Sequence, residues 1–152
     1  MKTIVIGCDN AGLNLKKVLI NHMIEKGINV EDIGSFEPED MTYYPLIAER
    51  VCEKIRQSDY TTEGVLICGT GIGMAMTANK FKGIRAAVCH DIYSAERAKL
   101  SNNSNVMCLG ERVMGSELAK SLLDRWLELT FKDGSSNVKL EAISDIENRN
   151  MK

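Results

Sequence analysis

The chain has 152 residues, of which 44% are hydrophobic and 26% are charged, and its net charge is −2. This length suits one domain with a buried core, and charges of both signs are mixed without a basic block, so neither a nucleic-acid-binding stripe nor a membrane-surface patch is indicated. A strand pattern begins at Thr3, and no apolar run approaches membrane-spanning length. We therefore expect a cytoplasmic protein without membrane or nucleic-acid partners.

Short β-rich runs alternate with stretches of helical periodicity along the chain. Strands are expected at residues 3–7, 29–33, 65–68, 85–89 and 106–109. Helices are expected from about residue 15 to Gly27, and at residues 44–59, 70–80, 92–100, 115–129 and 138–146. This alternation predicts an α/β fold with a parallel sheet covered by helices on both faces. The last helix is highly charged, which suggests that it packs on a partner.

The five cysteines and two histidines restrict the chemistry that the chain can support. An odd number of cysteines without a Cys-x-x-Cys pair argues against a disulfide framework and a zinc ribbon. Two histidines are too few for a histidine-rich metal site. We therefore expect no metal.

The segment from Val65 to Met74 combines an apolar strand, one thiol and three alternating glycines. Without Cβ atoms, Gly69, Gly71 and Gly73 let backbone amides approach an anion at the start of a helix, which favours an oxyanion or phosphate site. Cys68 ends the strand, where a thiol can serve as base or nucleophile or can be a small apolar filler. The spacing matches neither a dinucleotide fingerprint nor a P-loop, so no nucleotide cofactor is expected.

Ligands of an open parallel sheet bind beyond the carboxyl ends of its strands. Asp9 lies at such an end and is either a helix N-cap or a site residue. Arg112 lies at another, where it either clamps an anion or is solvated. We interpret His90 as a loop histidine and His22 as a structural residue within a helix. The candidate segments are residues 8–10, 68–73, 89–91 and 110–112.

A set of motifs spans nearly the whole chain: Gly7-Cys8-Asp9, Tyr44-Pro45, Ile67-Cys68-Gly69-Thr70-Gly71-Ile72-Gly73, Ala78-Asn79-Lys80, Gly83-Ile84-Arg85-Ala86, Tyr93-Ser94-Ala95, residues 102–106 and Gly110-Glu111-Arg112-Val113. Together they resemble the ribose-5-phosphate isomerase B family, which includes the galactose-6-phosphate isomerase subunits. The resemblance implies one sugar-phosphate isomerase domain over residues 1–152, with a Rossmann-like three-layer sandwich and a five-stranded sheet. It also implies that the C-terminal helix packs on a dimer partner.

The resemblance further implies an aldose–ketose isomerase that acts on a sugar phosphate through an enediolate, without a cofactor. In this chemistry a base removes a carbon-bound proton beside a carbonyl and returns it to the neighbouring carbon. The matching base is Cys68, with Thr70 holding substrate oxygens and Asp9 contacting the sugar. Fixed amide dipoles favour the charge that develops on the enediolate oxygen. The amides implied for this anion hole are those of Gly69, Gly71, Ile72 and Gly73.

The family works as a dimer with sites across the interface, so Asn102 and Arg112 are expected to face the partner's Cys68; a tetramer made of two such dimers is the alternative. Several positions depart from the family pattern. The family's ribose isomerases carry histidine at the positions of Asn10 and Ser101, and the second histidine opens the furanose ring. Where the family has two arginines that grip phosphate, this chain has Ser135 and Lys139; Tyr43 replaces an aspartate. These changes affect substrate handling and leave the proton-transfer residues intact.

Several functions remain open. The family default is ribose 5-phosphate to ribulose 5-phosphate, with Ser101 or water replacing the acid. A tetrose 4-phosphate cannot close a five-membered ring and would need no acid, and a hexose 6-phosphate is a further alternative. The chain can also be a subunit that needs a paralogous partner, or a non-catalytic sugar-phosphate-binding protein. A thiol redox role is disfavoured because no resolving Cys-x-x-Cys is present.

Overall fold

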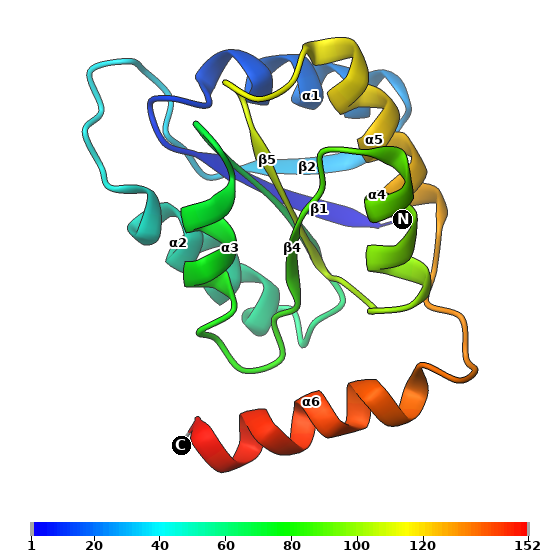
Figure 1. Cartoon of the computed structure of the whole chain (residues 1–152). Coiled ribbons are helices and arrows are strands. Elements are labelled where there is room, and N and C mark those ends of the chain that lie inside the picture. Colours follow the sequence, from blue (N-terminus) through cyan, green and yellow to red (C-terminus); the bar gives the residue numbers. More distant parts are fainter. Residues whose placement is uncertain (1, 152) are drawn as a thin grey trace.

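In the computed structural model, which describes residues 2–151, five strands form one parallel sheet (Figure 1). The order β2-β1-β3-β5-β4 puts β3 in the centre, with β1 and β5 on either side. Parallel registers such as Cys68 opposite Gly110 bring the carboxyl ends of β3 and β5 to one edge. The predicted fold class is confirmed. The strands are β1 Thr3–Cys8, β2 Asn29–Asp32, β3 Glu63–Cys68, β4 Ala86–Val88 and β5 Val106–Gly110.

Five helices cover the two faces of this sheet, and α6 lies apart from them along the bottom of the view (Figure 1). The face that carries Ile4 and Ile6 packs against α1, α4 and α5, where Trp126 is the largest buried side chain. The opposite face, with Val5 and Leu66, packs against α2 and α3. The bounds are α1 Leu13–Glu25, α2 Tyr44–Gln57, α3 Ile72–Ala78, α4 Ile92–Leu100, α5 Ser116–Glu128 and α6 Asn137–Asn150.

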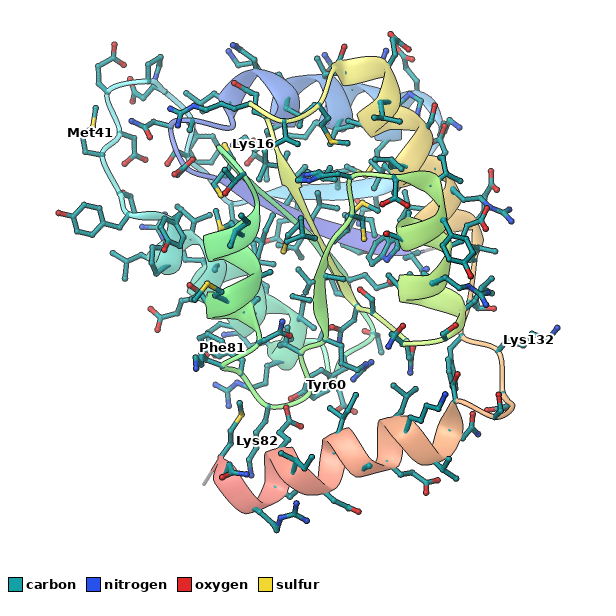
Figure 2. All side chains as sticks on the ribbon, viewed as in Figure 1. Lys16, Met41, Tyr60, Phe81, Lys82 and Lys132 are labelled. Carbon is teal, nitrogen blue, oxygen red and sulfur yellow. The ribbon has the colours of Figure 1, made fainter. Side chains whose placement is uncertain are left out.

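Residues of α1 tie it to α5 and to the loop that follows β2. His22 Nε2 lies 2.7 Å from Asp124 Oδ1, which confirms a structural role for this histidine. Lys16, only 2% exposed, donates to Asp32 Oδ1 at 2.7 Å and to the carbonyl oxygen of Ser35. Figure 2 shows Met41 at the outer end of this loop. The buried lysine therefore anchors a loop that runs on to the start of α2.

Helix α6 has no buried residue between Asn137 and Asn150. Glu147 Oε1 accepts a hydrogen bond from the backbone N–H of Gly83 at 3.1 Å. Next to this contact a cavity of about 590 Å³ opens between the helix and the sheet edge, bordered by Ile143, Ile146 and Ala86 among others. The expected packing of α6 on a partner stays a prediction. Within residues 2–151, the helices are all too short or too polar to span a bilayer.

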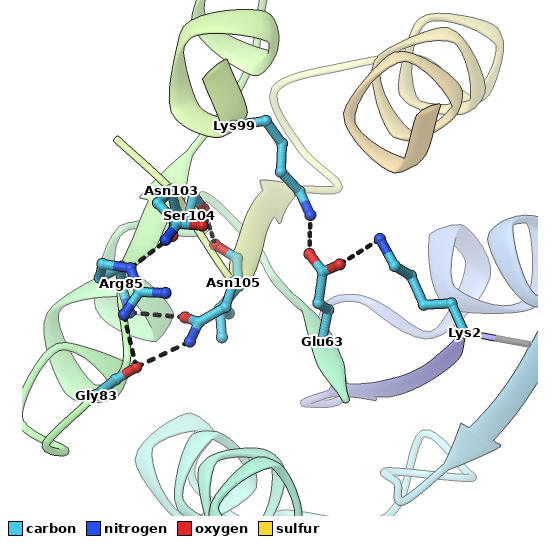
Figure 3. A network of polar contacts seen from close by, with 9 residues as sticks. Lys2, Glu63, Gly83, Arg85, Lys99, Asn103, Ser104 and Asn105 are labelled. Atoms are coloured by element: carbon cyan, nitrogen blue, oxygen red, sulfur yellow. Dashed lines mark hydrogen bonds and ion pairs between the residues drawn. The ribbon is translucent and has the colours of Figure 1, made fainter. Parts of the chain in front are cut away.

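The amino edge of the sheet holds a dense polar network (Figure 3). Glu63 at the start of β3 pairs with both Lys2 and Lys99. Beside it, the Arg85 guanidinium donates to the carbonyl oxygen of Asn103, and the Asn105 side chain accepts from Arg85 N at 2.7 Å. These contacts fix the segment between α4 and β5 at this edge. Ser101 and Asn102 belong to that segment.

Candidate active site

Cys68 is the last residue of β3 and is 5% exposed. The backbone N–H of Gly71 donates to its Sγ at 3.1 Å. This contact needs the left-handed backbone of Gly71, whose φ of 78° is accessible to glycine without strain. An N–H group that points at the sulfur stabilises negative charge there. The thiol is therefore held at the carboxyl end of β3 with a backbone donor on its sulfur.

The turn that contains Cys68 packs backbone against backbone on the end of β5. A Cβ on Gly71 would lie 2.9 Å from the carbonyl carbon of Leu109. A Cβ on Gly110 would lie 2.7 Å from Thr70 Cα. Real Cβ atoms do not approach other atoms so closely, so both positions require glycine. The glycines thus allow two backbone segments to touch, a role beyond the predicted anion contact.

Hydrogen bonds join the same two segments. The N–H of Glu111 donates to the carbonyl oxygen of Cys68 at 2.9 Å, and that of Arg112 donates to Gly69 at 3.1 Å. The Glu111 carboxylate also accepts from Leu15 N at 2.6 Å, which closes the first turn of α1. This contact between residues 96 positions apart has no local sequence signature, so sequence reasoning missed it.

Two of the amides proposed for the anion hole are engaged within the loop itself. Gly71 N–H faces the Cys68 sulfur, and Ile72 N–H donates to Thr70 Oγ1 at 3.3 Å. That these two amides bind substrate oxygen stays a prediction, and such binding would require them to leave these contacts. Thr70 is exposed and borders the groove described below, where its hydroxyl can meet a ligand.

Asp9 lies just beyond the carboxyl end of β1, and its Oδ1 accepts from the N–H of Ala11 at 3.0 Å. The N-cap of α1 is Gly12, so the N-cap alternative for Asp9 is wrong. The chain makes an additional turn before the helix starts. The Asp9 carboxylate therefore stays beside residues 68–71, called the Cys68 loop below. Burial raises the pKa of Asp9, although its hydrogen bond from Ala11 and the charge of Arg112 act in the opposite direction.

An open groove of about 490 Å³ lies over these residues. The aromatic ring of Tyr44 forms one wall. A Cβ on Gly73 would lie only 2.3 Å from this ring. Asn10 donates to Met41 Sδ at 3.6 Å, which joins this wall to the loop before α2. The predicted site residues that line the groove are Asp9, Asn10, Cys68, Gly69, Thr70, Ile72, Gly73 and Arg112.

Arg112 lies over the Cys68 loop of its own chain. Its Nη1 is 3.1 Å from the place of a Cβ on Gly69, and the side chain lines the groove with Cys68. The backbone bond from Arg112 to Gly69 turns the residue back across the end of β5. The expectation that Arg112 faces the partner's Cys68 stays a prediction.

Three predicted site residues do not meet Cys68 within one chain. Ser101 and Asn102 follow α4 at the amino edge of the sheet, opposite the edge that carries Cys68. Asn102 is exposed and borders the cavity beneath α6. Lys139 is exposed in the first turn of α6. A site that contains any of them with Cys68 would need a second chain.

His90 lies outside the residues that border the groove, in agreement with its interpretation as a loop histidine. Its Nε2 accepts from the N–H of Gly110 at 3.0 Å, and burial lowers its pKa. All five cysteines in residues 2–151 are buried and free. The same part of the chain contains no group of three His, Cys, Asp or Glu that could hold a metal ion.

Comparisons with known proteins give one consistent family. A sequence model of the ribose/galactose isomerase family matches residues 4–143. The ribose-5-P isomerase B of Listeria innocua serovar 6a is 51% identical over 147 residues, which cover 97% of this chain and 98% of the relative. The D-erythrulose-4-phosphate isomerase of Pectobacterium atrosepticum is 43% identical, covering 98% and 97%. The solved structure of ribose-5-phosphate isomerase B from Mycoplasma genitalium, with bound ribulose-5-phosphate, superposes with a TM-score of 0.92 at 33% identity and covers 97% of each chain.

Proposed function

The chain belongs to the ribose/galactose isomerase family, and from this premise we propose that it interconverts the aldose and ketose forms of a sugar phosphate. The observation that carries the proposal is the Cys68 thiol, which receives the Gly71 amide and borders a groove that also holds Asp9 and Arg112. A base, a carboxylate and a cation around an open groove suit an anionic, hydroxylated substrate. Since both hydrophobic cores form on the faces of one sheet, we take the chain to act as one domain.

In the proposed reaction, Cys68 as thiolate removes the proton from the carbon next to the carbonyl. The electron pair of the broken C–H bond forms the enediolate, whose oxygen carries the charge. The proton then returns from Cys68 to the neighbouring carbon, while a proton moves between the two substrate oxygens. The amides of Gly69, Thr70 and Gly73 are the donors that we propose for the enediolate oxygen, since dipoles fixed before the reaction favour the charged state.

We assign the phosphate to Arg112 of the same chain, with Lys139 of a second chain as an additional cation. A guanidinium can bind a phosphate with two parallel hydrogen bonds, whereas a lysine contributes a point charge. Because Ser101, Asn102 and Lys139 lie away from the Cys68 of their own chain, the complete site needs a partner. We propose a homodimer with shared sites; a tetramer or a paralogous partner remains an alternative for the same geometry.

Ribose 5-phosphate to ribulose 5-phosphate is the first candidate reaction, because it is named for the Listeria relative. A tetrose 4-phosphate is the second. Asn10 and Ser101 replace the histidines of the family's ribose isomerases, and the Pectobacterium relative is named for a four-carbon substrate. The phosphate of a tetrose 4-phosphate occupies the terminal oxygen, so the sugar stays open and needs no acid for ring opening.

The test is a coupled isomerase assay of the purified chain on ribose 5-phosphate, erythrose 4-phosphate and galactose 6-phosphate, with Cys68→Ala as the matched control. We expect Cys68→Ala to lower turnover about 1,000-fold, as for the loss of a general base. Uptake of solvent deuterium into the substrate separates an isomerase from a sugar-phosphate-binding protein, which would leave the C–H bond intact. Binding without exchange, or turnover that survives the Cys68 change, would contradict the proposal. If the chain alone is inactive and a second subunit restores activity, the alternative of a paralogous partner is supported.

A further inference from the structure

His90 continues the sheet at the point where β4 ends. The N–H of Cys89, just after the last β4 residue Val88, donates to the carbonyl oxygen of Cys108 at 3.1 Å. Two residues farther along β5, the N–H of Gly110 donates to His90 Nε2 at 3.0 Å. The imidazole nitrogen thus serves as the hydrogen-bond acceptor for β5 at the point where β4 has ended.

The Gly110 amide, which donates to His90, belongs to the segment that supports the Cys68 loop. Gly110 lies under Thr70 so closely that a Cβ would stand 2.7 Å from Thr70 Cα. The next two amides, those of Glu111 and Arg112, donate to the carbonyl oxygens of Cys68 and Gly69. A shift of the Gly110 peptide would therefore pass directly to the segment that carries the proposed base.

We propose that His90 is a positioning residue of the isomerase: its neutral imidazole fixes the Gly110 amide and thereby holds the Cys68–Thr70 loop in its reactive geometry. The residue borders no part of the substrate groove, so it acts through the backbone and contributes no group to the substrate. This inference rests on the proposed function for its kinetic part. Its structural part, the fixing of Gly110, can be measured without turnover.

The protonation state of His90 decides whether the bond exists. Nε2 can accept only while it carries no proton, and an imidazolium donates from both nitrogens. Burial lowers the pKa of His90 from 6.5, with the neighbouring Asp91 opposing the shift. The contact is therefore intact above pH 6.5 and is lost as the pH falls through the lowered pKa. Of the charged residues that follow Gly110, Glu111 accepts from Leu15 N through its carboxylate, and the Arg112 side chain borders the groove.

Two substitutions at His90 separate its hydrogen bond from its volume. In His90→Gln, Oε1 can occupy about the place of Nε2 and accepts at every pH. His90→Leu fills a similar space but leaves the Gly110 amide without its acceptor. We expect His90→Leu to lower kcat about tenfold with a smaller change in KM, and His90→Gln to stay within about threefold of wild type, because small misplacements of a reacting group reduce turnover strongly.

The pH profile identifies the mechanism. Below about pH 6, His90→Gln should keep a larger share of its own pH 8 turnover than wild type does, since its acceptor does not titrate. His22→Gln is the matched control, because His22 is the other histidine of the chain and pairs with Asp124 away from the groove. It should leave the profile unchanged. Equal losses in His90→Leu and His90→Gln, or acid profiles identical to wild type in His90→Gln, would overturn the proposal.

Amide hydrogen exchange supplies the readout that does not depend on activity. At pH 7.5, the segment 108–113 should exchange faster in His90→Leu than in wild type, whereas His90→Gln should restore slow exchange. If no sugar phosphate is isomerised by wild type, the proposed function fails while this measurement still tests the contact. Unchanged exchange in His90→Leu would refute the positioning role whatever the activity.

Discussion

The Cys68 loop and the set formed by Ser101, Asn102 and Lys139 are built in opposite ways. The loop is complete within one chain: its sulfur receives Gly71 N–H, and its carbonyl groups receive the amides of Glu111 and Arg112. The three other residues are exposed or half-buried and lie away from the groove. In the isomerase that we propose, folding of one chain therefore assembles the proton-transfer residues, whereas part of the substrate-binding set comes from a second chain.

The same contrast explains which positions differ from the family pattern. Gly71 and Gly110 admit no side chain, because backbone atoms of the facing segment occupy the space. Asn10 and Lys139, by contrast, are exposed, so a change of residue there disturbs no packing. Substitutions that alter substrate handling can accumulate at such places at little cost to folding, since exposed side chains contribute little to stability.

Mixing two impaired variants gives the largest expected effect and tests directly whether Cys68 of one chain and Asn102 of another share one site. Cys68→Ala removes the base, and Asn102→Ala removes a residue proposed to come from the other chain. Cys68→Ala alone should retain less than about 1% of wild-type turnover. Asn102→Ala alone should show a clearly reduced turnover. Unfolding and refolding them together should recover about a quarter of wild-type activity, since half the dimers are mixed and each mixed dimer has one intact site. Recovery no greater than the sum of the parents would show that each site belongs to one chain.

Gly110→Ala tests how tightly the loop is supported. Its Cβ would stand 2.7 Å from Thr70 Cα, so the two backbones must separate. We expect kcat/KM to fall about 100-fold, with a loss of about 1–3 kcal/mol in the free energy of unfolding by urea. Gly115→Ala is the control because a Cβ there meets open space. If Gly110→Ala keeps the turnover of wild type, close contact between the Gly110 and Thr70 backbones is not required for activity.

Ser101→His tests whether a residue proposed to come from the second chain determines which substrate is used. Restoring the histidine that the family's ribose isomerases carry should raise turnover of ribose 5-phosphate about tenfold, at the low end of what a general acid supplies. Turnover of erythrose 4-phosphate should stay nearly constant, because this sugar needs no ring opening. The ratio of the two rates, measured in one coupled assay, decides the outcome. A parallel rise for both substrates would remove ring opening as the explanation.

Arg112→Met gives the smallest expected effect and tests the residue that we propose for the phosphate. We expect KM for the sugar phosphate to rise about fivefold to tenfold with little change in kcat, because a net hydrogen-bond contribution of about 1–1.4 kcal/mol corresponds to that ratio. Arg97→Met, on α4, serves as the control for loss of charge. An unchanged KM would place the phosphate elsewhere.

The sequence predicts the elements well because apolar runs and helical periodicity are local signals, and the end of β3 at Cys68 follows from one uninterrupted run. It fails where the answer depends on contacts between distant segments. The N-cap of α1 falls on Gly12 after an additional turn that no pattern announces. The direction of Arg112 depends on its backbone bond to Gly69 across the sheet edge. Both positions lie in loops, where the path of the backbone, and not the residue type, decides what a side chain contacts.

Helix α6 has a consequence for how this protein would behave at low concentration. A helix of 14 residues without buried side chains is marginal in water by itself. If its apolar residues Ile143 and Ile146 are covered by a second copy, then ordering of the helix and association of the chains form one equilibrium. Dilution would unravel the C-terminus and separate the subunits together. Specific activity would then fall with enzyme concentration, although the Cys68 loop in each separated chain stayed intact.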